Sequence, residues 1–189
     1  NCPRGTASWF SARRSCLRGP SVAVSDGLSL ERRIIAQLDS QGVAYEVIPC
    51  DPELADTVNF CAHYGYPLQR SANTIVVAAR KEAGVACACV VLAHTRLDVN
   101  HTVCDLLGVR KASFAGPEQT VELTGMMIGG VTPFGLPESL PLFIDSRVPA
   151  EPWVIVGGGS RSLKLKVAPS VLSSLAGARV VEGLAMEKA

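Results

Sequence analysis

Long apolar runs and a strong charge bias are both missing from this chain of 189 residues, and each absence excludes a class of protein. No apolar run reaches the roughly 18 residues that a transmembrane helix needs, so we expect no membrane partner. The net charge of +1 argues against a strongly basic nucleic-acid binder, although it leaves room for a local basic patch. Hydrophobic residues make up 48% of the sequence and charged residues 19%, which predicts an ordinary globular domain.

The common motifs of hydrolytic and nucleotide-binding enzymes are also missing. There is no G-x-S-x-G nucleophile elbow, no H-E-x-x-H zinc motif and no G-x-G-x-x-G after a predicted strand. The glycine-rich residues 157–160 lack the Lys-Ser/Thr pair that completes a phosphate-binding P-loop. His101 and Cys104 lie on a predicted helix with no third residue to orient them. We interpret them as a surface residue and a core residue, not as a catalytic dyad.

The cysteines and histidines lack the spacing of a metal site. No two of the seven cysteines form a C-x-x-C pair, and His63, His94 and His101 are not spaced as zinc ligands. We therefore expect no metal ion and no other cofactor. Cys87 and Cys89 lie two apart in an apolar run, so a strand would place both on one face, as core residues in a reducing compartment. The remaining cysteines are Cys2, Cys16, Cys50, Cys61 and Cys104.

The first 27 residues differ from the rest of the chain. Arg4, Arg13, Arg14 and Arg18 are interspersed with serines, and no acidic residue occurs before Asp26. This bias is typical of a transit peptide and also of an unstructured extension. We expect residues 1–27 to lie outside the fold and residues 28–189 to form the domain. The expected location is cytoplasmic, or organellar if the extension is a transit peptide.

Apolar periodicity predicts a mixture of helices and strands. A helix is expected over residues 30–38, capped by Ser25 or Asp26, and another over residues 97–107. Two β-rich runs, residues 73–79 and 85–94, have a connection typical of a hairpin. Other helices are expected at residues 53–64, from 117 and at 169–176, and other strands at 44–50, 109–115, around 143, 153–156, 163–167 and 178–181. Strands outnumber helices without strict alternation, which indicates the α+β class: a single domain with a curved mixed β-sheet flanked by helices.

The most distinctive stretch is residues 123–135, where an apolar run ends at two glycines, a threonine and a proline. Adjacent glycines allow positive φ angles and close approach of other groups to the main chain. Pro133 fixes its own φ and biases Thr132 towards an extended conformation. These residues therefore predict a rigid loop with free backbone N–H groups, which is suited to binding a carbonyl oxygen or a phosphate. A tight turn between two buried strands is the alternative.

Four segments in order resemble the YbaK-like, prolyl-tRNA-editing family of aminoacyl-tRNA deacylases. The first is residues 71–80, Ser-Ala-Asn-Thr-Ile-Val-Val-Ala-Ala-Arg, which is similar to an early core strand of the family. Residues 97–111 resemble the helix that follows, with its Leu-Gly ending. The Gly-x-x-x-Pro loop of the family corresponds to residues 129–133, and residues 154–167 resemble its late Gly-Gly turn and strand.

The resemblance implies a YbaK-like fold and hydrolysis of the ester that joins an amino acid to the 3′ end of tRNA. In that family water attacks the ester, helped by groups of the substrate and by backbone donors of the Gly-x-x-x-Pro loop. The positions that correspond to catalytic ones are Gly129, Gly130, Val131, Thr132 and Asn73. Those that correspond to substrate-binding ones are Thr74, Pro133, Asp145, Gly158, Gly159 and Arg161. By this resemblance Pro133 holds the shape of the pocket, and Asp145, at a strand end, either contacts the α-amino group of the aminoacyl moiety or is a hydrogen-bonded turn carboxylate. Lys164 and Lys166 share a strand face, where they would meet tRNA phosphates or form a solvated edge.

Asn73 departs from the family pattern. Deacylases of the family usually carry a lysine there, before the threonine that corresponds to Thr74. Asparagine supplies hydrogen bonds but no charge. Lys81 lies past the end of the predicted strand and is a poor substitute. Asn73 therefore indicates either a subgroup that positions substrate differently or a protein that keeps the pocket and has changed the chemistry.

Three functions are compatible with these features. The leading hypothesis is a deacylase that acts in trans on mischarged tRNA, with Ala- or Cys-tRNA(Pro) as the first candidates. The second is a non-catalytic module that binds an aminoacyl-tRNA end or a nucleotide-like ligand. The third is a small-molecule hydrolase on the same scaffold. The expected partners are the aminoacylated 3′ end of tRNA and, as a further candidate, an aminoacyl-tRNA synthetase.

Overall fold

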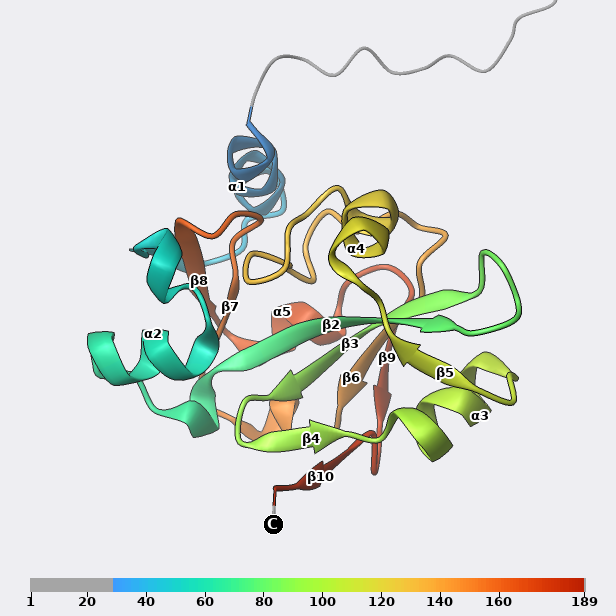
Figure 1. Ribbon diagram of the computed structural model, residues 1–189. Coiled ribbons are helices and arrows are strands. Elements are labelled where there is room, and N and C mark those ends of the chain that lie inside the picture. Colours follow the sequence, from blue (N-terminus) through green and yellow to red (C-terminus); the bar gives the residue numbers. More distant parts are fainter. Residues whose placement is uncertain (1–28, 189) are drawn as a thin grey trace, which may run out of the picture.

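The two apolar runs predicted as a hairpin form the centre of the fold. In the computed structural model, β2 (Ala72–Ala79) pairs antiparallel with β3 (Ala86–Leu92). Strand β6 (Leu142–Asp145) runs parallel to β3, and β9 (Ala178–Val181) runs parallel to β6. With β5 (Ala112–Phe114) antiparallel at the other edge, the strand order is β5-β2-β3-β6-β9. Figure 1 shows this mixed sheet crossing the middle of the molecule.

Structure is described for residues 29–188. The predicted extension over residues 1–27 lies outside this range, as do the predicted caps Ser25 and Asp26. Helix α1 (Leu30–Ser40) begins instead at Ser29, whose hydroxyl accepts a hydrogen bond from the Arg32 N–H. No helix within residues 29–188 is long and apolar enough to cross a membrane.

Both faces of the central sheet are buried at its middle strands β3 and β6, which explains why β3 is a continuous apolar run. Side chains such as Val76 and Val90 pack on one face against α1 and α5 (Pro169–Ser173). Cys87 and Cys89 point to the other face with their sulfurs 3.7 Å apart, so the prediction that they share a buried face is confirmed. Figure 1 shows α1 and α4 (Pro117–Thr124) above the sheet, and α3 (Cys104–Leu107), β4 (Thr95–Leu97) and β10 (Ala185–Glu187) below it.

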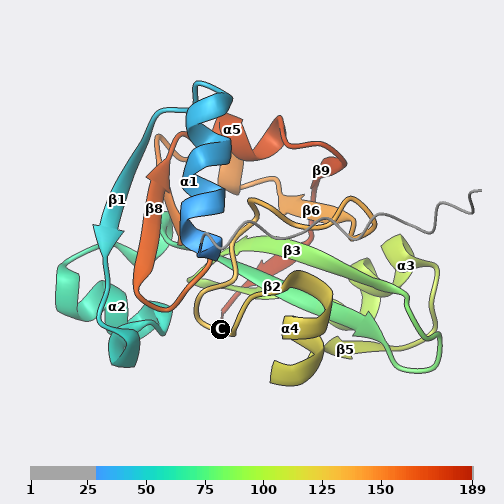
Figure 2. The same cartoon turned by 90° about the horizontal axis from the view of Figure 1, so that it is seen from above.

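A second sheet stands at one end of the first. Its order is β1-β8-β7, with β8 (Leu163–Val167) between β1 (Tyr45–Pro49) and β7 (Val154–Gly157), all antiparallel. A parallel bridge between Ser71 and Ile155 joins the two sheets. In Figure 2 the second sheet and α2 (Thr57–Tyr64) lie at the same end of β2. The predicted class is confirmed: one domain of mixed strands and helices.

The helix predicted over residues 97–107 is wrong at its start. Residues Thr95–Leu97 form β4, which pairs with β10 (Ala185–Glu187), a strand that the sequence did not indicate. The helix begins at Asp98, whose carboxylate accepts the backbone N–H groups of His101 and Thr102. It continues as a wider π turn, Val99–Val103, and then as α3 (Cys104–Leu107). Short 3-10 turns complete the fold at Pro52–Leu54, Leu68–Arg70 and Val148–Ala150.

Candidate active site

A pocket lies where the two larger sheets meet. Its walls come from the start of β2, from α2, from β7 and β8, and from the loop of residues 129–133. It contains about 420 Å³ of empty space, a volume that includes open solvent at its mouth. A wider groove continues outward and shares Thr57, Asn73, Thr74 and Gly129 with the pocket. The pocket therefore suits a small group attached to a larger one.

The loop turns alternate residues towards the pocket. Gly129 and Val131 line it, whereas Gly130 and Thr132 do not. The Gly130 N–H donates to the Met127 carbonyl at 3.0 Å, and the Thr132 N–H faces the Met126 sulfur at 3.4 Å. Among residues 29–188 the backbone N–H groups of Gly129 and Val131 have no acceptor. The loop thus has the predicted kind of donor, on two of the four residues proposed for it.

Thr132 and Pro133 are both buried beneath the loop and do not line the pocket. The Thr132 hydroxyl accepts a weak hydrogen bond of 3.4 Å from the Phe134 N–H. Their place is that of supports for the loop, which is the role expected for Pro133, whereas the expected contact of Thr132 with a ligand stays a prediction.

Glycines let the loop pack directly on the turn after β7. A Cβ atom on Gly157 would lie 2.2 Å from the Val131 carbonyl oxygen, and one on Gly130 would lie 2.4 Å from the Ser160 backbone. Gly159 donates its N–H to the Gly130 carbonyl at 2.9 Å. Gly157 lines the pocket, whereas Gly158 and Gly159, the predicted ligand contacts, do not. The late glycines therefore fix the position of the loop.

Lys164 is the pocket residue that sequence reasoning undervalued. Its side chain enters from β8, and the residue is only 5% exposed. The ammonium donates to the carbonyl oxygens of Ala55 at 2.8 Å and Gly129 at 2.9 Å, and lies 5.7 Å from the centre of the Phe60 ring. Burial lowers the pKa of Lys164 from its usual value. Strand alternation places Lys164 on the same face of β8 as Lys166. Only the position of the second sheet brings it into the pocket that Asn73 also lines.

Asn73 and Thr74, at the start of β2, also line the pocket. The Asn73 Oδ1 accepts from the Thr57 hydroxyl at 2.5 Å, which leaves the Nδ2 donors of the amide for other partners. The Thr74 hydroxyl oxygen is buried and has no hydrogen-bond partner among residues 29–188. Lys81 lies in the turn between β2 and β3, at the other end of the strand from Asn73. It does not replace the missing lysine.

A family model for the aminoacyl-tRNA editing domain matches residues 51–175, a range that includes every residue lining the pocket. The chain belongs to this family. Two solved structures are similar over most of their length. Hypothetical protein APE2540 is 25% identical with a TM-score of 0.72, and the match covers 82% of this chain and 99% of that one. A candidate trans-editing enzyme for prolyl-tRNA synthetase is 26% identical with a TM-score of 0.69, covering 86% and 99%.

Arg161 lies at the rim of the editing-domain pocket, on the outer groove. Its guanidinium donates to the Pro52 carbonyl at 3.0 and 2.6 Å and to the Ile128 carbonyl at 3.1 Å. It therefore ties the approach to the loop to the segment before α2. Lys166 points elsewhere: its ammonium pairs with Glu46 at 2.9 Å, which corresponds to the predicted alternative of a solvated edge.

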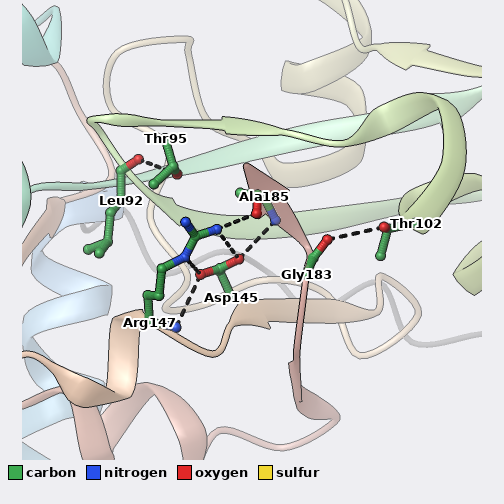
Figure 3. A network of polar contacts seen from close by, with 7 residues as sticks. All are labelled: Leu92, Thr95, Thr102, Asp145, Arg147, Gly183 and Ala185. Atoms are coloured by element: carbon green, nitrogen blue, oxygen red, sulfur yellow. Dashed lines mark hydrogen bonds and ion pairs between the residues drawn. The ribbon is translucent and has the colours of Figure 1, made fainter. Parts of the chain in front are cut away.

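Asp145 does not line the pocket of this editing domain, which favours the predicted alternative of a hydrogen-bonded turn carboxylate over a contact with a substrate amino group. The side chain is fully buried at the end of β6. Its carboxylate accepts from Arg147 Nε at 2.8 Å, Arg147 Nη2 at 3.2 Å and the Ala185 N–H at 2.8 Å, as Figure 3 shows. Arg147 also donates to the Ala185 carbonyl. The network attaches β10 to β6.

Among residues 29–188 no cluster of side chains is arranged to hold a metal ion.

Proposed function

We propose that this protein hydrolyses the ester bond between an amino acid and the 3′ end of tRNA, acting in trans. The observation that carries the proposal is the pair of unengaged N–H groups on Gly129 and Val131, at a pocket within an aminoacyl-tRNA editing domain. The ester carbonyl oxygen accepts hydrogen bonds from these two N–H groups. The hydrogen bonds strengthen when attack by water turns this oxygen into an oxyanion. Holding an activated ester in place supplies much of the remaining acceleration.

Water is the nucleophile in this reaction. Of the three hydroxyl groups at the pocket, that of Ser71 already donates to the Pro67 carbonyl and that of Thr57 to Asn73, while the Thr74 hydroxyl has no hydrogen-bond partner among residues 29–188 that could take its proton. The water oxygen bonds to the carbonyl carbon, and the bond to the ribose oxygen then breaks. A proton from the water ends on the ribose oxygen, so that the products are a free amino acid and tRNA with an intact 3′ hydroxyl.

The outer groove is the proposed place of the terminal nucleoside. Val58 and Ile128 border it and are 55% and 49% exposed, which provides apolar surface for a base. Arg161 and Lys188 add positive charge at the same groove. Aminoacylated tRNA is accordingly the partner, bound through its end and not through a broad basic surface.

The proposed substrate is tRNA(Pro) that carries alanine or cysteine. A small aminoacyl group fits between the small residues Ala72 and Gly157 of the pocket wall. One similar structure is that of a candidate trans-editing enzyme for prolyl-tRNA synthetase, which supports the same tRNA. A synthetase partner and a cytoplasmic location belong to this proposal.

Deacylation of a panel of charged tRNAs tests the function. The panel contains tRNA(Pro) carrying alanine, cysteine, serine, threonine or proline. We expect release of alanine or cysteine, and no release of proline. Absence of release from every species, with tRNA still bound, would favour the non-catalytic binding module, for which the neutral Asn73 is the supporting observation.

Asn73→Lys separates these two functions further. In a working variant site the lysine removes the amide donors and brings a second cation to the pocket that Lys164 also lines, so activity should fall about tenfold, the effect of losing roughly one hydrogen bond to substrate. Steady-state deacylation of the best panel substrate measures it, with Asn73→Ala for comparison. Activity that appears only in Asn73→Lys would identify the parent as a binder.

A further inference from the structure

Lys164 is a buried cation that forms no ion pair. It is the only buried lysine or arginine within residues 29–188, and none of the ion pairs in that range includes it. Burying an unpaired ammonium costs free energy that an apolar side chain of the same length would not. Stability of the fold therefore does not explain the charge.

The hydrogen bonds of Lys164 leave one donor free. An ammonium has three N–H groups, and the carbonyls of Ala55 and Gly129 take two. The Gly129 carbonyl belongs to the same peptide unit as the Gly130 N–H, which is held by Met127. This peptide is thus fixed at both ends, and the lysine is fixed with it on the pocket wall.

We propose that Lys164 donates its third hydrogen bond to the ester carbonyl oxygen of the substrate and stabilises the negative charge that develops there. The inference rests on the proposed hydrolysis. With the N–H groups of Gly129 and Val131 it completes a set of three donors around one oxygen. Lys164 keeps its proton throughout, because the proton released by water goes to the ribose oxygen.

The burial of Lys164 selects this ligand atom over a phosphate of the tRNA backbone. The residue is 5% exposed, so a single carbonyl oxygen inserted into the pocket reaches it, whereas a phosphodiester on the surface does not. Arg161 and Lys188, at the outer groove, are the cations available to the backbone. The charge at the bottom of the pocket thus acts on the reacting bond.

Lys164→Met is the test, with Lys166→Met on the same strand as the matched control. The expected result is a kcat lower by about 100-fold or more with KM changed less than about threefold, because the interaction strengthens as the oxyanion forms. Lys166→Met should keep the wild-type kcat, since that ammonium pairs with Glu46 outside the pocket. Thermal unfolding checks that both variants fold. An unchanged kcat in folded Lys164→Met would overturn the inference while leaving the deacylase function intact.

Two stable analogues keep the test independent of turnover. One is 3′-alanylamino-3′-deoxyadenosine, a neutral amide, and the other is the corresponding 3′-phosphonate, an anionic tetrahedral mimic. Wild type should bind the phosphonate about 100-fold more tightly than the amide, and Lys164→Met should lose that preference. This result in a protein that releases no amino acid would support the contact between Lys164 and the substrate oxygen and contradict the proposed hydrolysis. Equal affinities in wild type, or binding of neither analogue, would overturn the inference.

Discussion

Gly157→Ala should reduce deacylation about 100-fold. The added methyl group would lie 2.2 Å from the Val131 carbonyl oxygen, so the loop has to move away from β7. Movement of about 1 Å at a reacting centre costs on the order of 100-fold in rate. The backbone angle is not the cause, because Gly157 does not have a positive φ. Release of alanine or cysteine from charged tRNA(Pro) measures the effect.

Gly116→Ala is the matched control for this variant. Gly116 has φ −68°, and no atom lies within 4 Å of the place that an alanine methyl group would take, so the same substitution meets no obstacle. Overpacking at Gly157 should also lower the free energy of unfolding by about 1–3 kcal/mol, which denaturant titration measures. A Gly157→Ala variant with wild-type turnover would show that the loop position does not matter for the reaction.

Asp145→Asn should destabilise the fold by about 3 kcal/mol. Removing one member of a buried ion pair typically costs about 3–5 kcal/mol, and the partner Arg147 is 35% exposed, which places the cost at the lower end. The amide also cannot accept every hydrogen bond that Arg147 and the Ala185 N–H now donate. Chemical denaturation gives the loss, and Asp105→Asn, an exposed residue of α3, should change stability by less than about 0.5 kcal/mol.

The activity of Asp145→Asn distinguishes its two interpretations. Turnover per folded molecule should equal that of wild type if the residue only attaches β10 to β6. Loss of turnover in a fully folded variant would instead restore the amino-group contact expected from the sequence.

Acid should weaken the fold through the same carboxylate. Burial raises the pKa of Asp145, but hydrogen bonds from Arg147 and the Ala185 N–H outweigh burial and leave it below its usual value. A carboxylate with a lowered folded pKa stabilises the protein above its unfolded pKa and loses that contribution as the pH falls through the folded one. The free energy of unfolding should therefore fall below about pH 4, and less steeply in Asp145→Asn.

Local patterns predicted most of the secondary structure. Apolar runs rich in β-branched residues placed β2 and β3, and Gly108, with φ 66°, ends α3 at the Leu-Gly pair noted in the sequence. The sequence did not fully predict strands β4 and β10, because each has only three residues. Their pairing joins Thr95–Leu97 to Ala185–Glu187, two segments that are far apart in the sequence. That pairing also moved the start of the following helix to Asp98. Short strands are stabilised by their partner, which local sequence does not contain.

The site was predictable in its main chain and less so in its side chains. The glycines and proline of residues 129–133 indicated a loop with free N–H groups, which depends only on local backbone. Lys164 reaches the pocket because the second sheet stands against the start of β2, an arrangement joined by one bridge between Ser71 and Ile155. Asp145 was expected at a strand end, where it lies, but its neighbours Arg147 and Ala185 were set by β10.

Two of the three donors proposed for the reaction, the N–H groups of Gly129 and Val131, belong to the main chain. Every amino acid except proline carries that group, so most point mutations at Val131 leave its donor in place. The side chains of the pocket wall, such as Thr57, Ala72 and Ile155, are under no such constraint. Evolution can therefore change which amino acid is recognised by replacing wall residues one at a time, while the hydrolytic step is inherited with the backbone of the loop.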